Sequence, residues 1–274
     1  IADKRVVVGG EPVDVAEIFE STTDYKIPII EYTEATPRQI HEVFSLYNKQ
    51  GKHLNAEEIR NAVYHELDLM RALAVAAGDN PDMARAADFL LPEEAKIRRI
   101  KELLGEYRVG DARYRRTKVL SWLLSMLLSD SVGEDDRPRL LSTAQQINAL
   151  LERVQDSPTD PLRHTPTIRA SLALVSDAME SHTSVDAWAP VFKDNARGVR
   201  WQELQLVGSL LGVTVAAAVL GDRLEDRLIE REGALRELSA TEDWRRPPKT
   251  QTGKQWEYIA QISLAILDEL GEPA

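Results

Sequence analysis

From Thr36 onward, apolar residues recur at the three- and four-residue spacing of amphipathic helices. Thr36 is followed by Pro37 and Gln39, an order typical of a capped helix start, and we expect this helix to end before Gly51. Turn-rich segments separate the later apolar stripes. These stripes predict further helices over 93–104, 111–128, 139–154, 166–180, 201–220, 222–238 and 254–270.

The best-defined helix start lies at Asn55. Asn55 can cap the helix while Glu58, three residues later, reaches back to the Asn55 amide. Leu54 and Ile59 occupy the two positions of a hydrophobic staple. The apolar stripe then continues to Gly78, a suitable terminating residue, so we predict one helix over 55–78.

The first 35 residues have a different pattern. Two β-type runs, RVVV at 5–8 and KIPIIEY at 26–32, flank a short stretch in which Asp14 and Glu17 have capping-box spacing. This predicts a β-α-β segment too small to have a core of its own. The expected fold class is mainly α, a helical array behind a small α/β remnant, divided into domains 1–78 and 79–274.

Composition narrows the classes of function. The chain of 274 residues has no cysteine, which excludes disulfides, thiolate metal sites and cysteine nucleophiles and favours a cytoplasmic location. Its net charge of -11 requires any nucleic-acid contact to use a local basic patch. The chain begins at Ile1 with no signal-peptide pattern, so we expect a piece of a longer protein.

The most apolar run, 206–221, is shorter than the roughly 20 residues that cross a bilayer. Glu203 and Asp222 bracket it, and we predict a buried core helix and no membrane contact.

Local catalytic and metal motifs are missing from the sequence. It has no P-loop, no dinucleotide-binding glycine pattern, no H-E-x-x-H and no G-x-S-x-G, and its five histidines are scattered. The acidic cluster from Asp130 to Asp136 lacks the spacing of a calcium loop, and we interpret it as a solvated loop. We therefore predict no metal site and no cofactor within this chain.

One segment concentrates positive charge. Between Lys96 and Lys118 lie nine basic residues, three acidic ones and two interleaved tyrosines. The segment can neutralise phosphates and stack on a base, or it can be an exposed helix pair balanced by acidic neighbours, and the sequence leaves both interpretations open. The candidate nucleic-acid-binding residues are Lys96, Arg98, Arg99, Lys101, Arg108, Arg113, Tyr114, Arg115, Arg116 and Lys118.

A competing motif is Arg60-Asn61-x-x-x-His65. It matches the R-N-x-x-x-H signature of the HEPN superfamily of helical ribonucleases, which would make Arg60 a phosphate stabiliser and His65 the acid or base. Such sites normally need a second copy across a dimer, so this alternative implies a homo-oligomer. On an ideal helix, however, the two side chains would point about 140° apart.

A longer pattern resembles another family. The segment 25–65 contains IPIIEY and then F-x-x-x-N-x-x-G-x-x-L-x-x-x-E-I-R-N-A, a pattern found in the GmrSD N-terminal domain family of ParB-like and sulfiredoxin-like proteins. Where this family often has two glycines, the chain has Gln50-Gly51. The positions that carry the pattern, with the helix cap between them, are Phe44, Asn48, Gly51, Leu54, Asn55, Glu58, Ile59, Arg60 and Asn61.

The resemblance implies a bacterial anti-phage defence protein related to modification-dependent restriction systems. Its ParB-like subdomain, with a D-G-Q-Q-R type motif and a use for nucleotide and divalent metal, would lie upstream or on a partner chain. Neither that motif nor the H-x-x-P signature of an HNH nuclease is present here. The chain would then be a helical scaffold with DNA contacts, in which Glu58 and Arg60 orient the catalytic subdomain. The third hypothesis is that the chain is a purely structural or partner-binding helical module.

Overall fold

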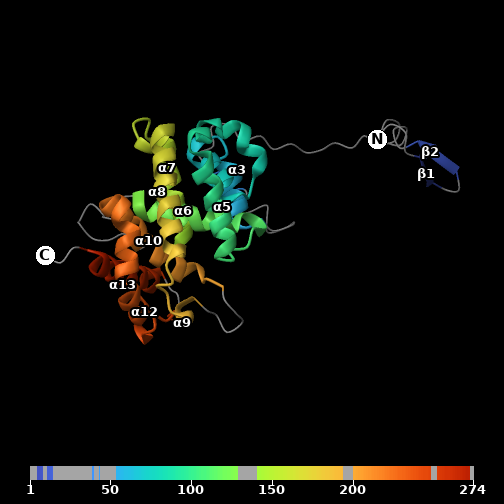
Figure 1. Cartoon of the computed structure of the whole chain (residues 1–274). Helices are drawn as coiled ribbons and strands as arrows, with labels where there is room; N and C mark the ends of the chain where they lie inside the picture. Colours follow the sequence, from blue (N-terminus) through green and yellow to red (C-terminus); the bar gives the residue numbers. More distant parts are fainter. Residues whose placement is uncertain are drawn as a thin grey trace. The chain divides into compact units, whose positions relative to one another are not determined.

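The computed structural model describes residues 5–8, 11–14, 39, 43, 54–128, 141–193, 200–247 and 252–271 (Figure 1). The chain forms two compact units, Ile1–Thr36 and Pro37–Ala274. The expected boundary at residue 78 therefore differs from the observed one. The reason is that Tyr64, Leu69 and Leu73, which precede residue 78, belong to the same hydrophobic core as the later helices.

In the first unit, strand β1 (Arg5–Val8) pairs antiparallel with β2 (Glu11–Asp14), and Arg5 lies opposite Asp14. The strand predicted at 5–8 is present, and Asp14 is the last residue of β2. Gly9-Gly10 between the strands is a typical two-residue hairpin sequence. The short helix expected after Asp14 lies outside the described residues. The second expected strand, 26–32, lies outside the described residues. The ParB-like α/β remnant is therefore not shown.

In the second unit, the described residues are mainly helical, which confirms that part of the fold class. Gln39 and Val43 are helical, as predicted for the helix that follows Thr36. The further elements are α3 (Ala56–Val63), α4 (Asp68–Ala77), the 3-10 helix η2 (Pro81–Glu93), α5 (Glu94–Glu106), η3 (Ala112–Tyr114), α6 (Arg115–Leu128), α7 (Thr143–Asp156), η4 (Pro161–Arg163), α8 (Thr165–Ser184), α9 (Pro190–Lys193), α10 (Glu203–Leu220), η5 (Gly221–Arg223), α11 (Leu224–Glu230), α12 (Glu232–Ser239), η6 (Glu242–Trp244) and α13 (Thr252–Leu270).

Two predicted helices are broken in the structure. The helix expected over 55–78 ends at Tyr64, and α4 begins at Asp68. The break allows Tyr64 to be buried while His65 remains exposed. Gly78 ends α4 with φ 72°, as predicted from its freedom to adopt left-handed backbone.

The helix expected over 222–238 is divided in the same way. A short 3-10 turn, η5, precedes α11, and Arg231 (φ -101°, ψ 8°) separates α11 from α12. The predicted apolar face is still buried in the divided helix, since Leu224, Leu228 and Leu235 are all buried.

Helix α10 is at the centre of the core and packs against α6, α8 and α13. Along it, Gly208 faces Ile259 and Ile262, and Gly212 faces Ser263 and Ile266, so α10 and α13 run parallel. The Ser263 hydroxyl donates to the Gly208 carbonyl at 2.9 Å. The missing side chains of the two glycines let the backbones approach closely.

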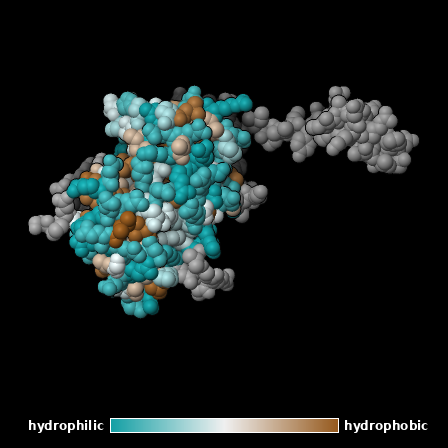
Figure 2. Space-filling view, viewed as in Figure 1, coloured by the Kyte–Doolittle hydropathy of each residue, from teal (hydrophilic) through white to brown (hydrophobic). Residues whose placement is uncertain are grey.

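The surface agrees with a buried α10. Among the described residues, only Glu203–Glu230 is apolar and long enough to span a membrane, and 67% of its most apolar window is buried inside the protein. The face in Figure 2 is mostly hydrophilic with scattered apolar side chains. The predicted core helix is confirmed.

Replacing Gly212 by Leu should destabilise the fold by about 3 kcal/mol, because overpacking a close helix contact forces backbone shifts. A Cβ at Gly212 would lie 3.0 Å from both Ile266 Cβ and the Ser263 carbonyl oxygen. The matched control is Gly233→Leu on α12, where a Cβ would meet no atom within 4 Å. In urea unfolding, we expect a lower midpoint for Gly212→Leu and an unchanged midpoint for Gly233→Leu. Equal midpoints for the two variants would contradict the close approach of α10 and α13.

Candidate functional site

The resemblance motif begins with the capping box at α3, which the structure confirms. The Asn55 side-chain oxygen accepts from the Glu58 amide at 2.8 Å, and Glu58 Oε2 accepts from the Asn55 amide at 2.7 Å. The same two side chains also bind the turn before α6. Asn55 Nδ2 donates to the Arg113 carbonyl at 3.0 Å, and Arg113 Nη2 donates to Glu58 Oε2 at 2.8 Å.

The turn held in this way is conformationally unusual. Arg113 and Tyr114 have φ values of 58° and 60°, a left-handed conformation that costs roughly 1 kcal/mol or more for a residue with a side chain. Asn61 and Asn80 donate to the Tyr114 hydroxyl at 3.2 and 3.4 Å. Residues of the motif thus fix the start of α6.

The remaining positions of the resemblance motif differ in their exposure, and some lie outside the described residues. Ile59 is buried, whereas Leu54 is exposed, and Phe44, Asn48 and Gly51 lie outside the described residues. We expected Glu58 and Arg60 to orient a catalytic subdomain. Within the described structure, their partners lie in the helical unit itself.

The alternative ribonuclease pair, Arg60 and His65, is not brought together. Arg60 is completely buried, pairs with Glu57 and donates from Nε to Asn148 Oδ1 at 2.8 Å. His65 follows the end of α3, is exposed and lies 3.0 Å from the Ala62 carbonyl through Nδ1. Because the Arg60 guanidinium has no access to solvent, this geometry cannot place it on an RNA phosphate.

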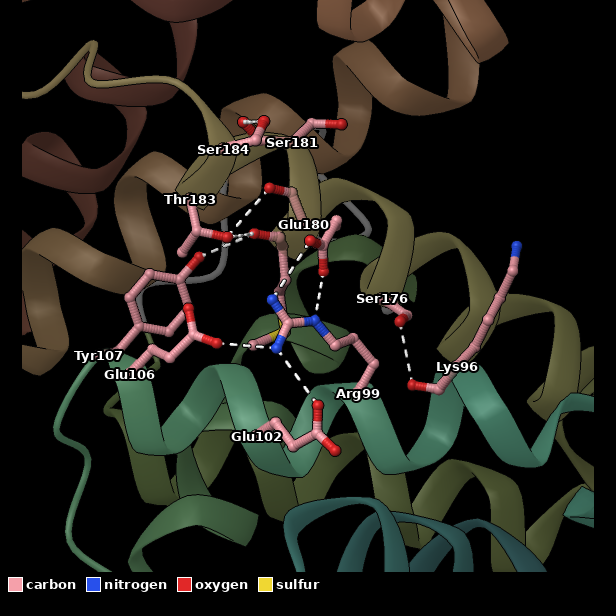
Figure 3. A network of polar contacts seen from close by, with 11 residues as sticks. Lys96, Arg99, Glu102, Glu106, Tyr107, Ser176, Glu180, Ser181, Thr183 and Ser184 are labelled. Atoms are coloured by element: carbon pink, nitrogen blue, oxygen red, sulfur yellow. Dashed lines mark hydrogen bonds and ion pairs between the residues drawn. The ribbon is translucent and has the colours of Figure 1, made fainter.

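Most cations of the basic segment are bound by acidic side chains from elsewhere in the chain. Figure 3 shows Arg99 on α5 between Glu102, Glu106 and Glu180, at 3.2, 2.7 and 2.5 Å. The hydrogen bonds to Glu180, Glu106 and Glu102 hold the pKa of Arg99 well above its ordinary value. The other pairs are Lys96 with Asp177, Arg113 with Glu58, and Arg115 and Lys118 with Glu203.

The rest of the segment is divided between packing and exposure. Arg116 donates from Nε to the Val109 carbonyl at 3.0 Å, and Arg98 approaches Glu94 at 3.8 Å. Lys101 and Arg108 are exposed and form no ion pair with another described residue. Of the two interpretations, the structure favours helices balanced by acidic neighbours, here on α3, α8 and α10.

A buried polar network was not foreseen from the sequence. His182 Nδ1 lies 3.0 Å from the Tyr107 hydroxyl, His182 Nε2 lies 2.9 Å from Ser209 Oγ, and Trp188 stacks on the imidazole at 4.6 Å. Burial, with a smaller effect of Lys193, lowers the pKa of His182 to about 3. A Ser-His-Tyr set can move protons, but each of these side chains is 0–1% exposed, so no substrate reaches it.

A sequence signal for this network exists. Leu172, Val175, Met179 and His182 follow one another at helical spacing in α8, so His182 continues a core-facing stripe. A histidine in such a stripe is expected to be buried and hydrogen-bonded.

No group of three His, Cys, Asp or Glu side chains that could hold a metal ion occurs in the part of the chain that the structure describes. The acidic cluster at 130–136 lies outside that part. No known protein family, curated protein or solved structure matches the chain. The GmrSD-like pattern therefore stands on its residues alone.

Proposed function

We propose that the unit 37–274 is a non-catalytic helical scaffold of a bacterial anti-phage defence protein of the GmrSD type. In this proposal the catalytic, nucleotide-using part is a ParB-like subdomain located upstream or on a partner chain. The observation that carries the scaffold role is the cluster in which Asn55, Glu58 and Asn61 hold the left-handed turn at Arg113 and Tyr114. The defence role rests on the resemblance of segment 25–65.

The ion pairs of the basic segment support a scaffold. Arg99 joins α5 to α8, Arg113 joins the η3 turn to α3, and Lys118 joins α6 to α10. A cation already paired with a carboxylate gains less from a phosphate, because the phosphate must displace that carboxylate. Duplex DNA contact is the second candidate, and the exposed cations Arg98, Lys101 and Arg108 favour it.

Changing Arg113, Arg115 and Arg116 together to Ala separates these two candidates. For a scaffold, the variant should unfold at lower urea, because contacts to Glu58, Glu203 and the Val109 carbonyl are lost. Its affinity for duplex DNA should be unchanged across a salt series. The second variant changes the exposed Arg98, Lys101 and Arg108 to Ala, and for a scaffold it should keep both the urea midpoint and the DNA affinity. Weaker DNA binding with a shallower salt dependence in either variant would instead make this segment a DNA-binding surface.

The defence role is tested separately in cells. Bacteria that express the gene with its upstream coding region should form fewer plaques when challenged with a phage whose DNA carries modified bases. The same phage grown without the modification is the matched control and should form plaques normally. Equal plaque counts for both phage stocks, with the protein present at normal levels, would contradict a role in modification-dependent restriction.

A further inference from the structure

Four helices begin around one hollow of about 320 Å³. Arg115 is the first residue of α6, Thr143 of α7 and Glu203 of α10, and Gln255 lies in the first turn of α13. All four of these residues line the hollow. Because a helix start carries partial positive charge, convergence of four starts favours an anion between them. Two of the starts already have one acceptor each, since Asp79 Oδ2 accepts from the Thr117 amide of α6 and Ser142 Oγ accepts from the Gln145 amide of α7.

The side chains of the hollow add to this field. Among the described residues, it is lined by four cations, Arg115, Lys118, Arg200 and Arg246, and by one carboxylate, Glu203. A cationic cavity of this kind contrasts with the net charge of -11 on the whole chain. Like charges at close range repel one another, and a bound anion would relieve this repulsion.

Glu203 balances only part of the charge. It accepts from Arg115 Nε at 2.5 Å and from Lys118 Nζ at 2.6 Å. Burial by itself would raise the pKa of Glu203, but these two cations outweigh it and the pKa is lowered. The carboxylate is therefore ionised and holds both cations at the wall of the hollow.

Arg200 and Arg246 form no ion pair with a carboxylate of the described residues. Arg200 forms no hydrogen bond or ion pair with any other described residue, and it is half-buried. Arg246 donates from Nη1 to Gln202 Oε1 at 3.1 Å and forms no ion pair within the described ranges. A guanidinium offers several donors in one plane, the arrangement that suits phosphate oxygens.

The direction of the two central helices strengthens the field. Since α10 and α13 run parallel, both of their starts face this hollow and both of their ends lie at the opposite side of the bundle. At that opposite side, Arg227 donates to the Leu270 and Gly271 carbonyls at 3.1 and 2.6 Å, where helix ends attract cations. The distribution of charge thus follows the helix dipoles at both ends.

We propose that this hollow binds a compact phosphate-bearing small molecule, such as pyrophosphate or a mononucleotide, through Arg200 and Arg246, with Arg115 and Lys118 as further donors. The volume of about 320 Å³ is at the small end of ligand pockets. Trp122 and Trp201 line the same hollow and provide an apolar wall for the rest of the ligand. The main donors, Arg200 and Arg246, take no part in the scaffold contacts, whereas Arg115 and Lys118 belong both to the hollow and, through Glu203, to the scaffold.

The test is to titrate the full chain with pyrophosphate and, separately, with adenosine 5′-monophosphate. Binding is measured by isothermal titration calorimetry and by tryptophan fluorescence. We expect saturable one-to-one binding, accompanied by a fluorescence change from Trp122 or Trp201. The double variant Arg200→Gln with Arg246→Gln should weaken binding at least about tenfold, since charged hydrogen bonds to the ligand are lost. The matched control is Arg98→Gln, an exposed arginine on α5 outside the hollow, which should bind as the unchanged chain does.

The proposal would be overturned if neither probe showed saturable binding. It would also be overturned if the double variant and the unchanged chain bound with equal affinity. A short single-stranded DNA tests the alternative source of phosphate. If the oligonucleotide binds through Arg200 and Arg246 and neither small probe competes with it, the small-molecule site is wrong. Circular dichroism of each variant distinguishes loss of binding from loss of fold.

Discussion

Replacing Arg60 by Met should lower the free energy of unfolding by about 3–5 kcal/mol, because it removes one member of a buried ion pair. Arg60 is 0% exposed, and its loss leaves Glu57 and Asn148 without their partner. A buried carboxylate with no cation beside it is more costly than the lost packing. This is the largest effect that we expect from a single substitution in α3.

The measurement is urea unfolding at neutral pH, with Arg71→Met as the matched control. Arg71 pairs with Asp68 three residues earlier, and its side chain is 26% exposed, so its removal should cost only about 1 kcal/mol. Adding Glu57→Gln to Arg60→Met should recover much of the loss, since the unpaired charge is then gone. Similar costs for Arg60 and Arg71 would show that the Arg60 pair is solvated.

Lowering the pH from about 6.5 to about 3.5 should destabilise the protein by roughly 4 kcal/mol through His182 alone. The pKa of His182 in the folded chain is about 3, whereas in the unfolded chain it returns to the ordinary value near 6.5. Between these values the unfolded state binds a proton that the folded state cannot accept. Stability is therefore complete above the unfolded pKa and declines by about 1.4 kcal/mol for each unit of falling pH.

The check is the pH dependence of urea unfolding for the unchanged chain and for His182→Gln. The glutamine can still form hydrogen bonds with Tyr107 and Ser209 but cannot be protonated, so part of the slope below pH 6.5 should disappear. His65→Gln, at an exposed histidine, is the control and should keep the slope. An identical slope for His182→Gln and the unchanged chain would mean that other groups cause the acid sensitivity.

Helix starts and ends were predictable where their signals are local. The Asn55 capping box spans four residues, and Gly78 ends a helix through its own backbone conformation. The breaks at Tyr64 and Arg231 could not be predicted in this way. The apolar stripe continues through both positions, and the breaks depend on how each segment packs against the core.

The candidate site was harder to predict, because the sequence does not show which acidic side chain pairs with each cation. The density of cations between Lys96 and Lys118 suggested phosphate contacts, yet their carboxylates come from distant segments. Arg113 is 55 residues from Glu58, and Lys118 is 85 residues from Glu203. Arg200 and Arg246, by contrast, lie in turn-rich segments that carry no motif.

By itself, the sequence determined that the chain is mainly helical, where most of its helices lie, and that α10 is buried, because periodicity and apolarity are properties of short segments. Only the tertiary structure decided that Arg60 is buried with Asn148, 88 residues away, and that Asn55 and Glu58 secure the turn before α6. It also decided that four helix starts surround one cationic hollow. Such contacts depend on which helices pack together and in which direction, and no local pattern specifies that choice.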